Sequence, residues 1–195
     1  MPWVTTSLIL KQLQGDEPDT WEQFIARFRR PVVMFARDQG LPAEEAEDAA
    51  QETLTEFLRT YREGRYDREK GRLHSWLFGI AHRVVLNRRR KLARDRQRQP
   101  AAQPTAFWDA VPNDDDARTS WDDSWRQAMF DQCLDQVRIE LEPKTVLAFE
   151  EYALNDRPAS EVARELGMSH NAVFLAKHRV LRRIRELRDQ LEIVA

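Results

Sequence analysis

Apolar residues recur at spacings of three and four along most of the chain, which is the pattern of helices that bury one face. This periodicity predicts a first helix over residues 21–39 and a second over residues 42–62. It also predicts a third helix that begins near Trp76 and ends in the basic run RRRK. Gly40 suits the end of the first helix, and Pro42 suits the start of the second. Because no stretch alternates polar and apolar positions as a strand does, the sequence predicts an all-α protein.

The helical pattern stops between residues 97 and 124. Prolines, an alanine-rich patch and the run Asp114-Asp115-Asp116 lie in this segment, and together they are typical of a flexible acidic linker. The predicted organisation is therefore two small helical domains, residues 1–96 and 125–195, joined by a linker over residues 97–124. The helices expected in the second domain cover residues 125–141, 144–155, 158–166 and 169–190.

Composition narrows the class of protein without changing this organisation. Of the 195 residues, 42% are hydrophobic, and no apolar run approaches the roughly 18–20 residues that cross a bilayer. The stretch MPWVTTSLILKQLQGDE has no basic residues ahead of its apolar patch, so we expect no signal peptide. The single cysteine, Cys133, excludes an internal disulfide, so we expect it to pack in a core and the protein to be cytoplasmic.

The charges are segregated along the chain, so the net charge of −2 conceals basic and acidic stretches. Residues 83–98 include eight bases and one acid, whereas residues 109–123 include six aspartates and one base. Over residues 156–190, bases again outnumber acids, eight to five. Separate surfaces of one chain can attract or repel a polyanion whatever the total charge, so nucleic acid is a candidate partner.

The stretch ASEVARELGMSHNAVFLAKH, residues 159–178, has the register of two helices that meet across a tight turn. Ala163 is small enough for close approach, Gly167 supplies the positive φ of the turn, and Val173 returns an apolar residue to the shared core. Ser169 suits the cap of the second helix. Because a basic tail follows, we interpret this segment as a helix-turn-helix that binds DNA. The alternative is an ordinary helical hairpin with a solvated cationic end.

The second helix of this segment carries the candidate DNA contacts. We expect His170, Asn171, Phe174 and His178 to face outward. In the major groove an asparagine pairs with adenine, an apolar ring contacts a thymine methyl group, and cationic side chains nearby suit phosphates. The candidate DNA-binding residues are Ser169, His170, Asn171, Phe174, Lys177, His178, Arg179, Arg182 and Arg183.

The stretch HSWLFGIAHRVVLNRRRKLARDR, residues 74–96, joins an aromatic and apolar start to a basic end. Because RRRK directly follows an apolar stripe, its arginines are expected on a packed helix, where they suit phosphate and base-edge contacts. We expect Trp76 to lie in the core rather than to stack on bases. The alternative for the basic run is a solvated cationic face.

The stretch EEAEDAAQE, residues 44–52, places Glu44, Asp48 and Glu52 on one face of a helix. Such a face is usually solvated, and its second interpretation is a docking surface for a basic partner, to which Gln51 adds hydrogen bonding. A metal site would need a histidine or carboxylates from facing helices, and the four histidines lie elsewhere in the sequence. We therefore expect no metal and no cofactor.

Three segments together resemble the extracytoplasmic-function (ECF, group 4) sigma factors of the sigma-70 family. EAEDAAQETLTEFLR, residues 45–59, is similar to the segment that docks on the coiled coil of the largest subunit of bacterial RNA polymerase. RYDREKGRLHSWLFGIAHRVVLNRRRK, residues 65–91, resembles the segment that melts and recognises the −10 element. RPASEVARELGMSHNAVFLAKHRVLRRIREL, residues 157–187, resembles the segment that recognises the −35 element.

The resemblance implies a transcription initiation factor rather than an enzyme, with a region 2-like domain and a region 4-like helix-turn-helix domain. It implies core RNA polymerase and promoter DNA as partners, and an anti-sigma factor as a regulator that is common in the family. It also implies that the acidic linker passes through the basic catalytic cleft of the polymerase. The polymerase-docking residues would be Glu45, Asp48, Gln51 and Glu52. The −10 residues would be Arg83, Asn87, Arg88, Arg89, Arg90 and Lys91.

The chain departs from the family at two places. Arg83 stands where the family often has asparagine, and Asn87 stands where it often has aspartate, so the usual pocket for a flipped −10 base is not carried over. In the −35 segment, Phe174, Leu175 and Ala176 stand where the family commonly has a Lys-Ser-Arg run. The −35 sequence is therefore not inherited from the family, and this turn favours apolar contacts over phosphate contacts.

Two other functions compete with a sigma factor. A free-standing helix-turn-helix regulator would bind duplex DNA by itself and would not need the acidic surface around Asp48 and Glu52. A metal-dependent nuclease built on Glu44, Asp48 and Glu52 would cleave DNA when a divalent ion is added, which we do not expect. Charge reversal at Asp48 and Glu52 separates the regulator from the sigma factor, because only a sigma factor would lose polymerase binding.

Overall fold

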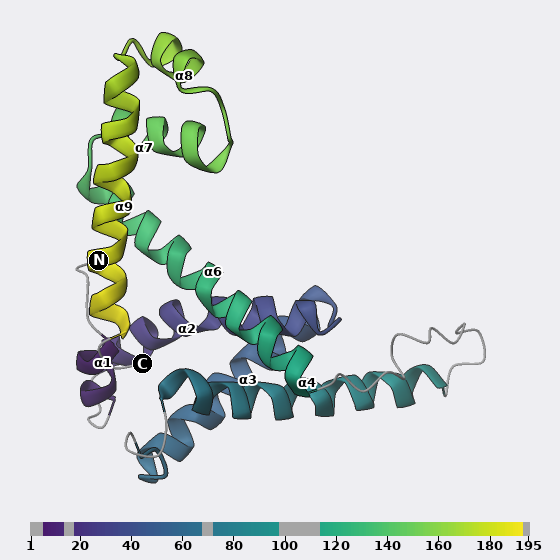
Figure 1. Cartoon of the computed structure of the whole chain (residues 1–195). Coiled ribbons are helices and arrows are strands. Elements are labelled where there is room, and N and C mark those ends of the chain that lie inside the picture. Colours follow the sequence, from purple (N-terminus) through teal and green to yellow (C-terminus); the bar gives the residue numbers. More distant parts are fainter. Residues whose placement is uncertain (1–5, 14–17, 68–71, 98–113, 193–195) are drawn as a thin grey trace. The chain divides into compact units, whose positions relative to one another are not determined.

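The computed structural model describes residues 6–13, 18–67, 72–97 and 114–192 (Figure 1). Every regular element within these ranges is a helix, which confirms the predicted all-α class. None of the helices in these ranges combines the length and the apolar content that crossing a membrane requires. The described chain divides into an amino-terminal unit, Thr6–Ala128, and a carboxy-terminal unit that begins at Met129.

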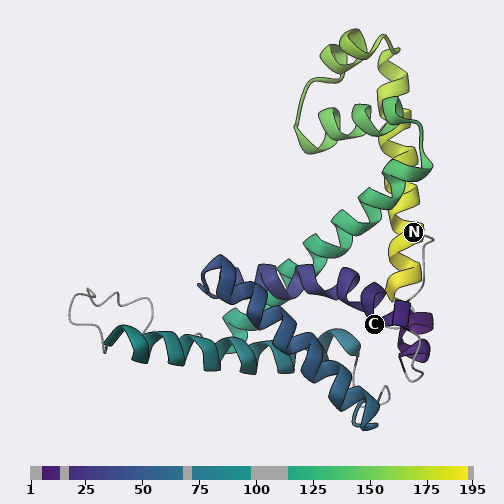
Figure 2. The same cartoon turned by 180° about the vertical axis from the view of Figure 1, so that it is seen from behind.

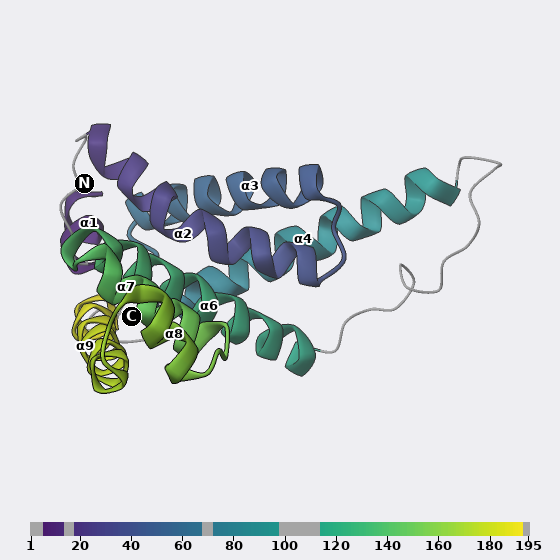
Figure 3. The same cartoon turned by 90° about the horizontal axis from the view of Figure 1, so that it is seen from above.

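Three long helices form the centre of the amino-terminal unit. α2 (Pro18–Asp38), α3 (Ala43–Arg62) and α4 (Leu73–Gln97) lie side by side in all three ribbon views (Figures 1, 2 and 3). A short helix that the sequence pattern did not predict, α1 (Thr6–Gln12), packs on α2. The apolar stripes of the three long helices meet in a core that includes the buried side chains of Phe24, Phe28, Phe35, Leu54, Phe57, Leu77 and Val85.

The turn between α2 and α3 has the form that the sequence predicts. Gly40 adopts a φ of 87°, a left-handed conformation that costs glycine little. Its N–H donates to the carbonyl of Arg37 at 2.8 Å, and the N–H of Leu41 donates to the carbonyl of Ala36 at 3.0 Å. α3 then begins directly after Pro42. Glycine and proline at these positions therefore set the end of one helix and the start of the next.

The expectation that residues 114–124 belong to a flexible linker without helical structure is wrong. α6 (Asp114–Glu140) is already helical at Asp114, and its residues up to Ala128 belong to the amino-terminal unit. Three aspartates occupy its first turn, where the helix dipole favours negative charge. An acidic run that is typical of a linker is thus equally suited to begin a helix. The rest of the predicted linker, residues 98–113, lies outside the described residues.

The first half of α6 packs on α2 and α4 through aromatic side chains. Trp121 is fully buried, and its ring meets the ring of Phe35 edge-on with the centroids 5.5 Å apart. The centroid of Phe78 from α4 lies 6.0 Å from that of Trp121. Trp125 stacks on Phe28 at 5.6 Å. Because aromatic side chains bury large apolar areas, this half of α6 is part of the core of the unit.

The carboxy-terminal unit packs shorter helices against α9 (His170–Glu192), which runs along α7 and α8 (Figures 1 and 2). α7 (Pro143–Phe149) begins at Pro143, as expected, and continues into a π-helical turn, η1 (Glu150–Leu154). α8 (Ala159–Leu166) follows. Cys133, on α6, is buried. The small core shared by these helices consists of Ala148, Ala159, Val162, Ala163, Val173 and Ala176.

The turn between α8 and α9 confirms the predicted register of two helices that meet closely. Gly167 adopts a φ of 57°, and a Cβ added there would meet nothing within 4 Å, so backbone conformation rather than space requires glycine. The N–H of Met168 donates to the carbonyl of Ala163 at 2.8 Å. Ser169 caps α9, because its Oγ accepts a hydrogen bond from the N–H of Ala172 at 3.1 Å.

Candidate partner and nucleic-acid interfaces

The sequence predicts a docking surface and a −10 surface as separate features, and the fold brings them together at one groove. This groove lies between α3 and α4. Its lining includes Asp48, Gln51, Glu52, Arg83, Asn87 and Arg88. α3 contributes the carboxylates of Asp48 and Glu52, and α4 contributes the guanidinium groups of Arg83 and Arg88, so opposite charges face each other across it.

Arg88 bridges the groove and is held by three carboxylates of α3. Its Nη1 donates to Glu45 Oε2 at 2.9 Å and to Asp48 Oδ2 at 3.3 Å. Its Nη2 donates to Glu52 Oε2 at 3.0 Å. Burial by itself lowers the pKa of Arg88, but the hydrogen bonds to Glu45 and Glu52 outweigh burial, so that its pKa is raised. The predicted −10 residue Arg88 is therefore directed at the predicted docking residues.

The other members of the basic run on α4 differ in exposure. Arg89 is buried, with 6% of its surface exposed, and this burial lowers its pKa. Asn87, Arg90 and Lys91 are exposed. A side chain that reaches nucleic acid from this helix must be accessible, so the exposed residues are the stronger candidates and Arg88 and Arg89 the weaker ones.

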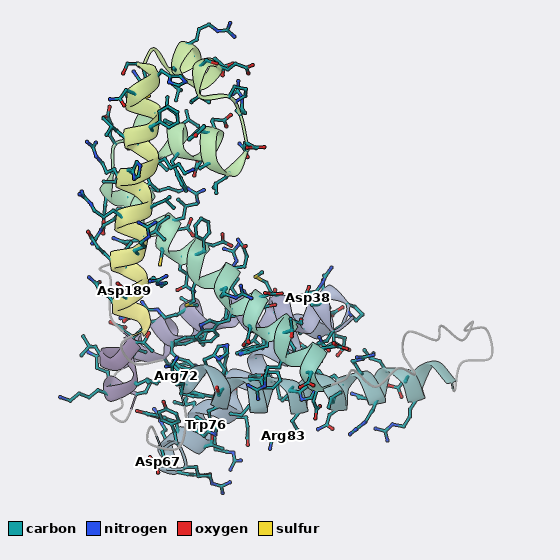
Figure 4. The ribbon with its side chains drawn as sticks, in the orientation of Figure 1. Asp38, Asp67, Arg72, Trp76, Arg83 and Asp189 are labelled. Carbon is teal, nitrogen blue, oxygen red and sulfur yellow. The ribbon has the colours of Figure 1, made fainter. Side chains whose placement is uncertain are left out.

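Arg83, the first candidate −10 residue, is exposed on α4 (Figure 4). Its Nη2 lies 3.6 Å from Glu56 Oε1 on α3, and 61% of its side chain is exposed. Glu56 receives stronger hydrogen bonds from Arg59, which are the main reason why the pKa of Glu56 is lowered. An ion pair this exposed contributes little free energy, so Arg83 can leave Glu56 at low cost. Arg83 is therefore accessible to a ligand at the groove.

Trp76, labelled on α4 in Figure 4, is half-buried in an aromatic cluster of the amino-terminal unit. Its ring stacks on that of Tyr66 with the centroids 4.9 Å apart and meets that of Phe57 at 5.1 Å. Trp76 thus contacts the buried Phe57, as expected of a core residue, but is itself only half-buried. Arg88 holds Asp48 and Glu52 of the groove, and within the described ranges no group of three or more His, Cys, Asp or Glu side chains is placed to hold a metal ion.

The outward face of α9 lies opposite its buried stripe. Val173, Ala176 and Val180 are buried and point into the unit. Residues three and four apart share a helix face. The outward face, which we define as Asn171, Leu175, His178 and Arg182, follows this spacing, and all four residues are exposed.

The expectation that Phe174 faces outward is wrong. Phe174 is half-buried and packs against the small core, with its ring edge-on to Tyr152 at 5.3 Å between centroids. The ring of His170, an exposed residue, meets Phe174 at 4.9 Å. Lys177 is also half-buried, and its Nζ lies 5.2 Å from the centroid of Tyr152. Leu175, which was not among the predicted contacts, has 56% of its surface exposed instead.

Arg183 is held by carboxylates rather than by solvent. Its Nε and Nη2 donate to Glu140 at 2.5 and 3.1 Å, and its Nη1 donates to Glu186 at 3.0 Å. The hydrogen bonds to Glu140 and Glu186 raise the pKa of Arg183. The hydrogen bond from Arg183 correspondingly lowers the pKa of Glu140. By contrast, Arg179 is exposed, and Arg182 is 74% exposed with only a 3.9 Å contact to Glu186.

The groove therefore places a cationic surface, which suits a polyanion, beside an acidic surface, which suits a cationic ligand. Residues 24–95 match the family described as Sigma-70 region 2, and the match covers most of α2, all of α3 and nearly all of α4. Over these residues the chain is similar to region 2 of the sigma-70 family, which is a family of transcription initiation factors. RNA polymerase and promoter DNA are the partners that the family implies. A comparison with curated proteins found no match to the sequence.

Proposed function

We propose that this protein is a cytoplasmic ECF (group 4) sigma factor that binds bacterial core RNA polymerase and directs it to promoters through −10 and −35 elements. The observation that carries the proposal is the match of residues 24–95 to Sigma-70 region 2. In this proposal α3 docks on the polymerase through Glu45, Asp48, Gln51 and Glu52, and α4 contacts the −10 strand.

The carboxy-terminal unit would bind the −35 element as a helix-turn-helix, with α9 in the major groove. The turn at Gly167 and the exposed polar and cationic side chains of α9 support this role, because a recognition helix needs a fixed docking angle and accessible donors. His170, Asn171, His178, Arg179 and Arg182 remain candidate −35 contacts. Ser169 would act through the cap of α9.

Run-off transcription tests the proposal. Purified core polymerase with the full chain should start transcripts at defined promoters, and sequencing those transcripts would give the −10 and −35 elements. Core polymerase alone should not start at these sites. If the protein fails to associate with core polymerase even at low salt, the proposal is wrong.

A free-standing helix-turn-helix regulator is the second candidate, and charge reversal on α3 separates the two. The double variant Asp48→Arg, Glu52→Arg should lose polymerase binding if the chain is a sigma factor and keep DNA binding if it is a regulator. The double variant Glu22→Arg, Glu142→Arg is the matched control, because it makes the same charge change at two exposed residues outside α3. Since Arg88 contacts Asp48 and Glu52, the thermal unfolding of each variant should be measured alongside.

A further inference from the structure

Leu175 is a large apolar side chain exposed on a helix face that is otherwise polar. Isolated surface leucines are ordinary in proteins, and exposure by itself carries no meaning. The position of Leu175 is what distinguishes it. Asn171 precedes it by one turn, His178 follows it by one turn, and Arg179 is exposed beside it.

The charges around Leu175 indicate what covers this face. Arg179 and Arg182 are exposed on the same half of α9, and Arg185 one turn further on is exposed as well. Along this stretch the nearest exposed acid is Glu186, which lies 3.9 Å from Arg182. A face with an apolar centre, an amide, an imidazole and a cationic border is complementary to the major groove, where base edges lie between two rows of phosphates.

The chemistry of a leucine in the major groove is restricted to one kind of contact. Leucine has no donor or acceptor, so it cannot bind the polar edges of guanine, cytosine or adenine. The C5-methyl group of thymine is the apolar group that the major groove presents. Phe174 was the apolar candidate from the sequence, but it packs on Tyr152 and the small core.

We infer that Leu175 contacts the C5-methyl group of a thymine in the −35 element and makes this protein prefer thymine at that position. This inference rests on the proposed function and adds a residue that determines which promoters are chosen. Asn171 and His178 then form hydrogen bonds to bases on either side, and Arg179 and Arg182 contact the flanking phosphates.

Replacement of thymine by deoxyuracil tests the contact, because the two bases pair identically and differ only in the methyl group. A promoter library with a randomised −35 region, transcribed by core polymerase with the full chain, first identifies the preferred bases. Each preferred thymine is then replaced singly by deoxyuracil, and promoter affinity is measured. We expect one position at which deoxyuracil lowers affinity about fourfold, as expected for losing one buried methyl group.

Leu175→Ala should bind the thymine and deoxyuracil promoters equally at that position, while its thermal unfolding is unchanged because the side chain is exposed. Leu154→Ala is the matched control, since Leu154 is 47% exposed on η1 and not on the outward face of α9. Leu154→Ala should still bind the thymine promoter about fourfold more tightly than the deoxyuracil promoter.

Two results would overturn the inference alone: initiation that is insensitive to deoxyuracil at every position, or a methyl dependence that persists in Leu175→Ala. The first result would leave contact with a protein partner as the explanation of the exposed leucine. A complete absence of initiation by the wild-type protein would overturn the proposed function, and the inference with it.

Discussion

Arg88 on α4 donates a hydrogen bond to Glu45 on α3 at 2.9 Å, and this pair ties together the two helices that line the groove. The side chain of Arg88 is only 22% exposed, and Asp48 and Glu52 also accept hydrogen bonds from it. An arginine from the run predicted to bind DNA thus neutralises the surface predicted to bind polymerase.

Replacing Arg88 should therefore have two opposite effects. In Arg88→Gln, three carboxylates lose their shared cation, and we expect the free energy of unfolding to fall by about 1–2 kcal/mol. The same carboxylates become available to a basic partner, so the affinity for core polymerase should rise. Urea unfolding and a polymerase-binding titration measure the two effects. Arg90→Gln, at an exposed residue of α4, should change neither. Weaker polymerase binding by Arg88→Gln would mean that Arg88 contributes to docking.

Removing Trp121 tests whether the first half of α6 is part of the core. Trp121 is fully buried, and Trp121→Ala should lower the free energy of unfolding by about 3–5 kcal/mol in urea. Its indole Nε1 has no hydrogen-bond partner among the described residues, so Trp121→Phe, which keeps an aromatic ring and leaves a smaller cavity, should cost less than Trp121→Ala. If residues 114–124 were a mobile linker, Trp121→Ala and Trp121→Phe would both leave the free energy of unfolding nearly unchanged. That result would contradict the packing of Trp121 in the core.

The protonation of His74 should make stability depend on pH. Burial lowers the pKa of His74, and this effect exceeds the attraction of Asp122, whose carboxylate lies 3.2 Å from Nε2. Arg118 and Arg72 lower the pKa further. Between the lowered pKa of the folded protein and the ordinary histidine pKa of about 6.5, the unfolded chain binds more protons. Stability that is present above about 6.5 is therefore lost as the pH falls below that value and through the pKa of the folded protein.

Urea unfolding at pH 7.5 and at pH 5.5 measures this loss. The wild-type protein should lose more stability between the two values than His74→Gln, because glutamine does not titrate. An identical loss in both proteins would show that other groups cause the pH dependence.

Adjacent arginines on α9 should have different roles. Arg182→Ala should weaken promoter binding across sequences and reduce the salt dependence by about one unit of slope, because one phosphate contact is removed. Arg183→Ala should mainly destabilise the carboxy-terminal unit, because it leaves Glu140 without its guanidinium. Salt titrations of holoenzyme binding and thermal unfolding distinguish the two. Equal salt slopes for both variants would contradict the assignment.

Local chemistry was sufficient to predict the turns. Gly40, Pro42, Gly167 and Ser169 act through their own backbone or side chain within a few residues, so their roles follow from the sequence. The predicted helices also follow from the spacing of apolar residues, because each helix buries one stripe.

The contacts of Arg88 and Phe174 depend on what the fold brings near them, so the sequence could not predict them. Arg88 belongs to a run of bases, and only the packing of α3 against α4 places three carboxylates beside it. Phe174 lies next to Leu175 on α9, and only the fold places the ring of Tyr152 beside Phe174.

The start of α6 was missed for a different reason. Residues 114–124 contain a buried stripe, with Ala117, Trp121 and Ser124 at helical spacing, and this stripe was available in the sequence. The acidic run ahead of it favoured a linker, although aspartates also stabilise the first turn of a helix. The helical spacing of Ala117, Trp121 and Ser124 therefore indicates a helix at these residues, which the acidic composition alone does not.

The bridge across the groove would also affect which basic proteins could bind the carboxylates of α3. Arg88 is covalently part of the same fold, so its local concentration at the three carboxylates far exceeds that of any free competitor. A protein that offers a single lysine to these carboxylates would therefore gain little binding free energy. A partner that docks on α3 would have to displace Arg88 from these carboxylates, which favours a partner with several cationic groups over one with a single charge.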